Sequence, residues 1–197
     1  MSINILDHEK SKRVKIVNLK EQDLDKLIFP FKKHSITSLE YKPFSRFTIA
    51  KTLDDCFKGE LSKKLNEILK DRNSGTVIVQ PEIKDKKFDK EFLVKLSTCL
   101  AYLVGLPNFD SMTGKYYARF EVKHTDSSDS YLRKAYSNLD LHTDGTYVKE
   151  KTDWLIMTKM EETNVSGGES VILHLDDWEY LDELSKDPVG RENFVWS

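Results

Sequence analysis

The sequence predicts an α+β fold with a β-sandwich or barrel as its core. Two amphipathic helical patterns occupy the first half of the chain, and alternating or β-branched segments follow Pro107. Helices that precede a run of antiparallel-looking strands are typical of this fold class. The length of 197 residues, without an internal repeat or a low-complexity linker, predicts a single domain over residues 1–197.

The helical patterns lie at residues 57–71 and 92–104. In both, apolar side chains recur at a spacing that places them on one helical face. Gly75 follows the first helix and Gly105 the second, and glycine is the usual residue after a helix end. The β-branched segment 76–80 predicts a short strand between them. The apolar positions of the first helix are Phe57, Leu61, Leu65, Ile68 and Leu69.

Three further strands are predicted after Pro107. Residues 115–123 alternate between an apolar face, which includes Tyr116 and Phe120, and a polar face. Residues 154–160 and 170–175 are the second and third strands. Asp176 or Asp177 then caps a helix that runs to about residue 184, because Asp is a favoured N-cap residue.

Composition excludes several classes of protein. The net charge is -2 with both signs interspersed, which argues against a nucleic-acid partner. No apolar run approaches the roughly 18 residues of a membrane-spanning helix, and the polar N-terminus lacks the apolar core of a signal peptide. Cys56 and Cys99 are predicted to be reduced core residues, so we expect a cytoplasmic protein.

His142 and Asp144 form the sharpest local motif. Residues two apart on an extended segment point to the same side, so both side chains can converge on one ion. Imidazole plus carboxylate is the ligand mix of the facial triad of non-haem Fe(II) oxygenases, and Gly145 lets the chain turn away. A solvated surface pair is the alternative interpretation.

Other polar residues are candidates for binding a carboxylate. Ser170 follows a Gly-Gly turn and has a hydroxyl that can hydrogen-bond a carboxylate, although the turn alone also fits an ordinary hairpin. Arg119 lies on the polar face of a predicted strand, where its guanidinium can bind a carboxylate bidentately or face solvent. Arg133 is a candidate for the same role. Tyr117 and Tyr147 can line a pocket or lie in the core.

His124 and His174 are two further histidines that could bind a metal. His174 alternates with the apolar Val171 and Leu173 at the end of a predicted strand. This pattern favours a structural histidine, and we do not expect His174 to be the third ligand.

Several longer segments resemble the carbon-starvation-induced glutarate 2-hydroxylase family, from about Leu39 onward. The matching segments are 41–47, 50–55, 109–120, 129–133, 141–147 and 173–179. The resemblance implies a double-stranded β-helix (jelly-roll) core with flanking N-terminal helices. It also implies Fe(II), with 2-oxoglutarate and O2 as co-substrates, and hydroxylation of glutarate to L-2-hydroxyglutarate in lysine degradation. Family members are cytoplasmic homotetramers.

Carried onto this sequence, the resemblance makes His142 and Asp144 the first two iron ligands. Ser170 matches a hydroxyl position near 2-oxoglutarate, while Arg119, Arg133 and Tyr117 are the candidates for binding glutarate. The family's second iron-binding histidine and its 2-oxoglutarate-binding arginine have no counterpart before Ser197. We therefore expect a C-terminally truncated, incomplete jelly roll with little activity alone. The alternatives are an inactive fragment and a related oxygenase acting on another small acid.

Overall fold

The computed structural model describes residues 3–83, 88–109, 114–121, 140–144 and 152–188. The chain divides into two compact units. The N-terminal unit comprises Met1–Ala118 with Thr158–Met160, and the second unit comprises Arg119–Met157 with Glu161–Ser197. The described elements are helices and one three-stranded sheet, so the predicted mixture of α and β structure is confirmed.

The sheet of the N-terminal unit has the strand order β1-β2-β3. β1 (Asn4–His8) and β2 (Ser11–Leu19) form an antiparallel hairpin, and β3 (Thr76–Pro81) pairs parallel to β2. Ile16 is the register partner of both Leu6 and Ile78. Side chains alternate between the two faces of a strand, and on β2 this alternation buries Val17 and Leu19 completely.

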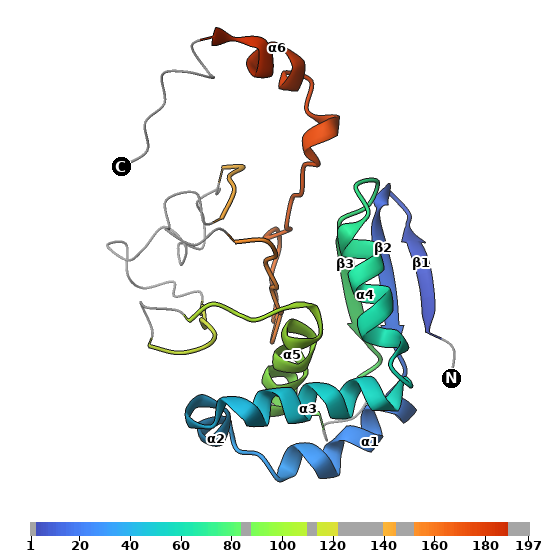
Figure 1. Ribbon diagram of the computed structural model, residues 1–197, viewed down its shortest axis with the longest axis vertical. Coiled ribbons are helices and arrows are strands. Elements are labelled where there is room, and N and C mark those ends of the chain that lie inside the picture. Colours follow the sequence, from blue (N-terminus) through green and yellow to red (C-terminus); the bar gives the residue numbers. More distant parts are fainter. Residues whose placement is uncertain (1–2, 84–87, 110–113, 122–139, 145–151, 189–197) are drawn as a thin grey trace. The chain divides into compact units, whose positions relative to one another are not determined.

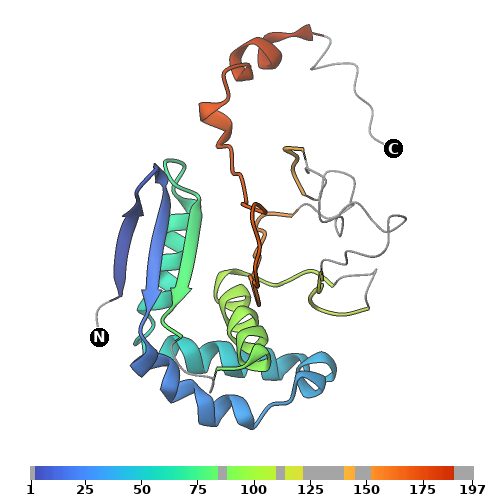
Figure 2. The ribbon, with the colours of Figure 1, turned by 180° about the vertical axis from the view of Figure 1, so that it is seen from behind.

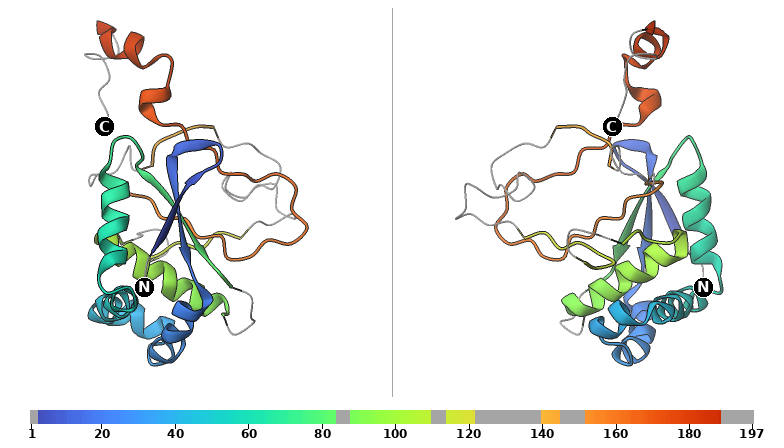
Figure 3. Two further views of the ribbon diagram at one scale, coloured as in Figure 1. Left: turned by 90° about the vertical axis from the view of Figure 1, so that its right-hand side faces the viewer. Right: turned by 60° about the vertical axis from the view of Figure 1, so that its left-hand side comes forward.

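Five helices complete the described part of the N-terminal unit. Figure 1 shows α4 along one face of the sheet, and Figure 2 shows the sheet in front of it. In Figures 1 and 3 α5 lies against α3, with which it is in contact. The helices are α1 (Glu21–Lys32), α2 (Ile36–Tyr41), α3 (Pro43–Cys56), α4 (Glu60–Lys70) and α5 (Lys90–Val104).

The sequence predicted a helix over 57–71, but the helix there, α4, begins only at Glu60. Residues 57–59 form a non-helical connection between α3 and α4. Lys58 and Gly59 adopt φ angles of 57° and 80°, in the left-handed region that a glycine occupies without steric cost. The Asp54 carboxylate then accepts hydrogen bonds from the Ser62 backbone N–H (2.9 Å) and hydroxyl (2.7 Å). The backbone N–H groups in the first turn of a helix have no partner within that helix, and the Asp54 carboxylate accepts from one of them.

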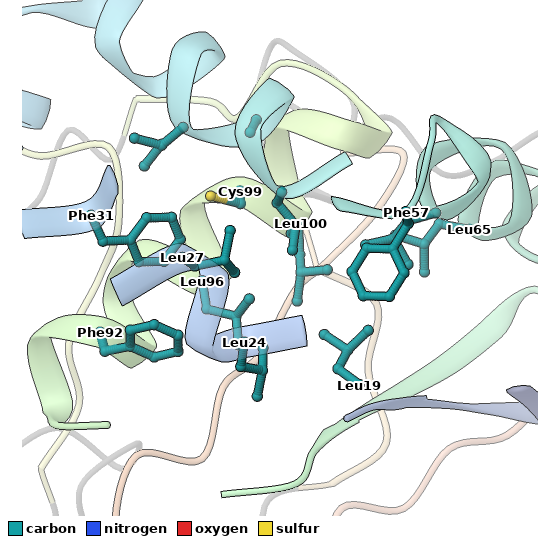
Figure 4. Packing of buried hydrophobic residues seen from close by; sticks show 14 of the residues in the cluster. Leu19, Leu24, Leu27, Phe31, Phe57, Leu65, Phe92, Leu96, Cys99 and Leu100 are labelled. Atoms are coloured by element: carbon teal, nitrogen blue, oxygen red, sulfur yellow. The ribbon is translucent and has the colours of Figure 1, made fainter. Parts of the chain in front are cut away.

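The second predicted helix is confirmed as α5. Asp89 is its N-cap, and the Asp89 carboxylate accepts from the Phe92 N–H at 2.7 Å. α5 carries much of the core (Figure 4), in which the Phe92 ring lies 5.1 Å from the Phe31 ring between centroids. The fully or almost fully buried core includes Leu19, Leu24, Leu27, Phe31, Leu39, Leu53, Leu61, Leu65, Phe92, Leu96 and Cys99.

The strands predicted after Pro107 do not form within the described residues. Tyr116 is buried as predicted, but its neighbour on the predicted apolar face, Phe120, is 66% exposed. Residues 154–160 and 170–174 run without sheet pairing. A strand is stable only when its backbone groups find a partner, and side-chain alternation does not reveal whether that partner exists. The described part of the chain therefore does not include a jelly-roll core.

The predicted helix start at Asp176 or Asp177 is also wrong. Both residues lie in a short 3-10 turn, η2 (Leu175–Asp177), and α6 (Leu181–Lys186) begins later, after Tyr180. Neither aspartate caps α6, because Tyr180 occupies its N-cap position. Of the described helices, none has the length and apolar character needed to cross a membrane.

Candidate functional site

His142 and Asp144 lie close together in the second unit. The Nε2 atom of His142 is 3.7 Å from the Oδ1 atom of Asp144, and both side chains are about half exposed at 47% and 48%. A metal ion lies about 2.0–2.2 Å from an imidazole nitrogen or a carboxylate oxygen. The two atoms are therefore close enough for one ion to contact both.

A hydrogen bond fixes which imidazole nitrogen faces Asp144. The Nδ1 atom of His142 lies 2.7 Å from the backbone carbonyl oxygen of Asp140. Because a carbonyl can only accept, Nδ1 carries the proton and donates. In the neutral ring Nε2 is then left with its lone pair on the side of Asp144. Metal-binding histidines are commonly oriented by such a bond from the other ring nitrogen.

The donor set fits two positions of a facial triad. Within the described ranges, no three His, Cys, Asp or Glu side chains are grouped closely enough to hold a metal ion. His142 and Asp144 thus supply one nitrogen and one oxygen, the mixture that Fe(II) oxygenases use. Metal binding by this pair stays a prediction.

His174 has a different environment. Its Nδ1 atom accepts a hydrogen bond of 3.1 Å from the backbone N–H of Asp176, so the neutral ring carries its proton on Nε2. His174 thereby caps η2. This geometry agrees with the structural role that the sequence favoured. His124 lies outside the described residues.

Ser170 is exposed and follows two glycines that adopt positive φ angles, Gly167 at 86° and Gly168 at 76°. The bend of this segment lies earlier, at Thr163 and Asn164, where Asn164 has a φ angle of 52°. Arg119 is also exposed and begins the second unit, whereas Tyr117 is half-buried in the N-terminal unit. Arg133 and Tyr147 lie outside the described residues.

An arginine that the sequence analysis did not select joins several elements of the N-terminal unit. The Arg46 guanidinium donates to the backbone carbonyls of Leu39 and Glu40, at 2.5 and 2.9 Å, and to the Tyr102 hydroxyl at 3.0 Å. It also lies 4.1 Å from the centroid of the Tyr116 ring. The only sequence signal was its place in the segment 41–47, which carries part of the family resemblance.

A cavity of about 240 Å³ opens beside α1 and α5, and Lys95 lines it. Lys95 is almost fully buried and donates to the Phe31 carbonyl and to the Glu91 carboxylate. These bonds hold the ammonium within the helical packing, so the cavity is not our candidate site.

Comparison with known proteins identifies a family and several relatives of this chain. A family model described as CsiD matches residues 3–197. The chain is 48% identical over 162 residues to a glutarate 2-hydroxylase of Klebsiella pneumoniae. This match covers 82% of this chain and 50% of that protein. It is 45% identical over 162 residues, with the same coverage, to glutarate 2-hydroxylases of Salmonella newport and Salmonella typhimurium. The chain spans about half the length of these relatives.

Proposed function

The chain belongs to the CsiD family, and from this membership we propose that the protein acts as a glutarate 2-hydroxylase. The proposed reaction converts glutarate, 2-oxoglutarate and O2 into L-2-hydroxyglutarate, succinate and CO2. The observation that carries the proposal is the identity of 48% over 162 residues to a relative with this name. The alternative substrate class is another small acid.

Fe(II) is the proposed metal, and the geometry of His142 and Asp144 supports it. Their facing Nε2 and Oδ1 atoms offer one imidazole and one carboxylate ligand, and the bond from His142 to the Asp140 carbonyl holds the ring in place. When bound, the metal with 2-oxoglutarate and O2 supplies the oxidising chemistry, while the protein binds and orients the reactants.

The remaining candidate residues are proposed to bind carboxylates. Glutarate carries two carboxylates at neutral pH, so its site needs cations and hydrogen-bond donors. Arg119 and Arg133 supply guanidinium groups for glutarate, and Tyr117 supplies a phenol. Ser170 is proposed to donate its hydroxyl hydrogen to a carboxylate of 2-oxoglutarate.

We further propose a single jelly-roll oxygenase domain, with residues 1–197 as its N-terminal portion, that assembles as a homotetramer in the cytoplasm. The exposed apolar residues 171–173 support the first point, since such side chains are usually covered in a folded domain. The assembly and the location rest on the family alone.

The test is an assay of the protein expressed from the full reading frame that contains this chain. Purified protein receives Fe(II), 2-oxoglutarate and O2, with glutarate or with dicarboxylates one methylene shorter or longer. We expect equal amounts of succinate and L-2-hydroxyglutarate with glutarate, and little succinate when every dicarboxylate other than 2-oxoglutarate is omitted.

Two results would overturn the proposal. One is succinate formation that glutarate does not stimulate while another dicarboxylate does. The other is full activity in Asp144→Ala protein that remains folded by circular dichroism.

A further inference from the structure

Tyr116 is held from several sides within the N-terminal unit. The residue is 7% exposed, and its ring lies over the Arg46 guanidinium, 4.1 Å from ring centroid to guanidinium carbon. Its hydroxyl oxygen lies 3.4 Å from the Thr98 hydroxyl oxygen on α5. A planar guanidinium can stack on an aromatic face while its N–H groups bond in the guanidinium plane. Arg46 uses both properties.

Arg46 is itself held by two backbone carbonyls and a hydroxyl. Its N–H groups bond to the carbonyls of Leu39 and Glu40 near the C-terminal end of α2, where backbone carbonyls have no partner within the helix. A third bond reaches the Tyr102 hydroxyl on α5. These three bonds hold the guanidinium, and the Tyr116 ring lies against it.

The constraint extends to the next residue. The rings of Tyr116 and Tyr117 pack edge to face, with centroids 4.8 Å apart and an interplanar angle of 75°. The residue before Tyr116, Lys115, pairs with the Glu40 carboxylate at 3.1 Å. The segment 115–117 is thus attached to α2 and α3 through Glu40 and Arg46, and the Tyr117 ring packs against the ring that Arg46 contacts.

We propose that Arg46 is a positioning residue for substrate binding, because it fixes Tyr116 and thereby sets the Tyr117 phenol at the dicarboxylate. This inference rests on the proposed function, in which Tyr117 contacts glutarate. Arg46 touches no reactant in this scheme. Its effect on catalysis passes through the hydroxyl of Tyr117.

A double-mutant cycle tests this route. Arg46→Met keeps much of the aliphatic stem and removes the guanidinium. We expect it to raise the glutarate KM about tenfold or more, since small misplacements at a binding site have large effects. The KM for 2-oxoglutarate and kcat should stay within about twofold of the wild-type values. Tyr117→Phe should raise the glutarate KM similarly, and the double variant should be no worse than Tyr117→Phe alone.

Arg46→Lys is the second variant in case Arg46→Met does not fold. It keeps the charge but lacks the planar donor group that bonds to the two carbonyls and Tyr102 at once. Its glutarate KM should lie between those of the wild type and Arg46→Met. If Arg46→Met is insoluble, the glutarate KM of Arg46→Lys should still exceed that of the wild type, with kcat unchanged. Lys51→Met, which removes an exposed charge from the same helix, is the matched control and should leave every parameter unchanged.

The outcomes separate two failures. If wild-type protein does not turn over glutarate, the proposed function fails and this inference fails with it. If wild-type protein does turn over glutarate, an unchanged KM in the folded Arg46 variants overturns only the positioning role. Effects of Arg46→Met and Tyr117→Phe that multiply in the double variant would also overturn it, because they would mean that Arg46 acts independently of Tyr117.

Discussion

The ammonium nitrogen of Lys95 lies 2.9 Å from the backbone carbonyl oxygen of Phe31, so a buried cation on α5 binds the C-terminal end of α1. The Lys95 side chain is 6% exposed, and its second partner is the Glu91 carboxylate at 2.5 Å. Carbonyls at a helix C-terminus carry partial negative charge and favour a nearby cation. Lys95 therefore connects two helices whose apolar faces form the core.

Lys95→Met tests the contribution of this cation to stability. The Phe31 carbonyl keeps its bond from the His34 N–H, and Glu91 is half exposed, so neither partner is left buried and unpaired. We expect a loss of about 1–2 kcal/mol in the free energy of unfolding, measured by urea titration. Lys51→Met on α3, where both ionic partners are exposed, should leave the unfolding midpoint unchanged. Equal midpoints for wild type and Lys95→Met would contradict the prediction.

The second prediction concerns stability at alkaline pH. Burial raises the pKa of the Cys99 thiol well above its ordinary value. Between the unfolded pKa, about 8.5, and the higher folded pKa, the folded state holds a proton that the unfolded state has lost. Stability must then fall as pH rises through this window, and it is fully present below it.

Urea midpoints measured between pH 7 and 9.5 check this effect. Cys99→Ala should show a shallower alkaline decline than wild type, even though its midpoint at pH 7 is lower because of the lost packing. Cys56→Ala is the control at the half-buried cysteine, whose pKa is raised less by burial. Parallel pH curves for wild type and Cys99→Ala would show that the buried thiol does not contribute.

The sequence predicted the parts of the fold that depend on local pattern. The apolar spacing in 92–104 identified α5, and the β-branched segment 76–80 identified β3. The break at Gly59 was missed because apolar positions continue in register across it, from Phe57 to Leu61. The hairpin of β1 and β2 was also missed, because polar residues interrupt the apolar alternation of both strands. Its place in the sheet depends on pairing with β3, which lies far along the chain.

The candidate site was predictable to a similar degree. Two-residue spacing was enough to bring His142 and Asp144 together, because that geometry depends only on an extended backbone. The contact between Arg46 and Tyr116 was not predictable, since it joins residues 70 positions apart through α3 and the segment after α5. Contacts between distant residues also decide whether the strands expected at 154–160 and 170–175 form, because a strand needs a pairing partner. A local sequence pattern does not show that partner.

The third prediction is that His142 and Asp144 retain the metal. In protein from the full reading frame, Asp144→Ala and His142→Ala should each weaken Fe(II) binding by about tenfold or more, because loss of even an outer contact to a ligand costs this much. Anaerobic titration with Fe(II) and metal analysis after gel filtration measure the effect. His174→Ala is the matched control: its ring caps η2, so its removal should leave Fe(II) affinity unchanged. A larger loss in His174→Ala than in His142→Ala would exchange their roles.

The last prediction concerns Arg119, the proposed guanidinium for glutarate. Arg119→Gln keeps a polar side chain with N–H donors, although a shorter one, and removes the charge that pairs with a carboxylate. We expect the glutarate KM to rise about tenfold or more, with Fe(II) affinity unchanged, and Arg119→Lys to recover only part of the loss because an ammonium cannot bind bidentately.

Steady-state kinetics at several glutarate concentrations, at fixed saturating 2-oxoglutarate, measure this change. Lys186→Gln, which removes an exposed charge from α6, corrects for any general effect of net charge on a dianionic substrate. If Arg119→Gln and Lys186→Gln change the glutarate KM equally, Arg119 acts only through the overall field and does not contact the substrate. A specific rise in Arg119→Gln, with Fe(II) titration identical to wild type, assigns the guanidinium to the dicarboxylate.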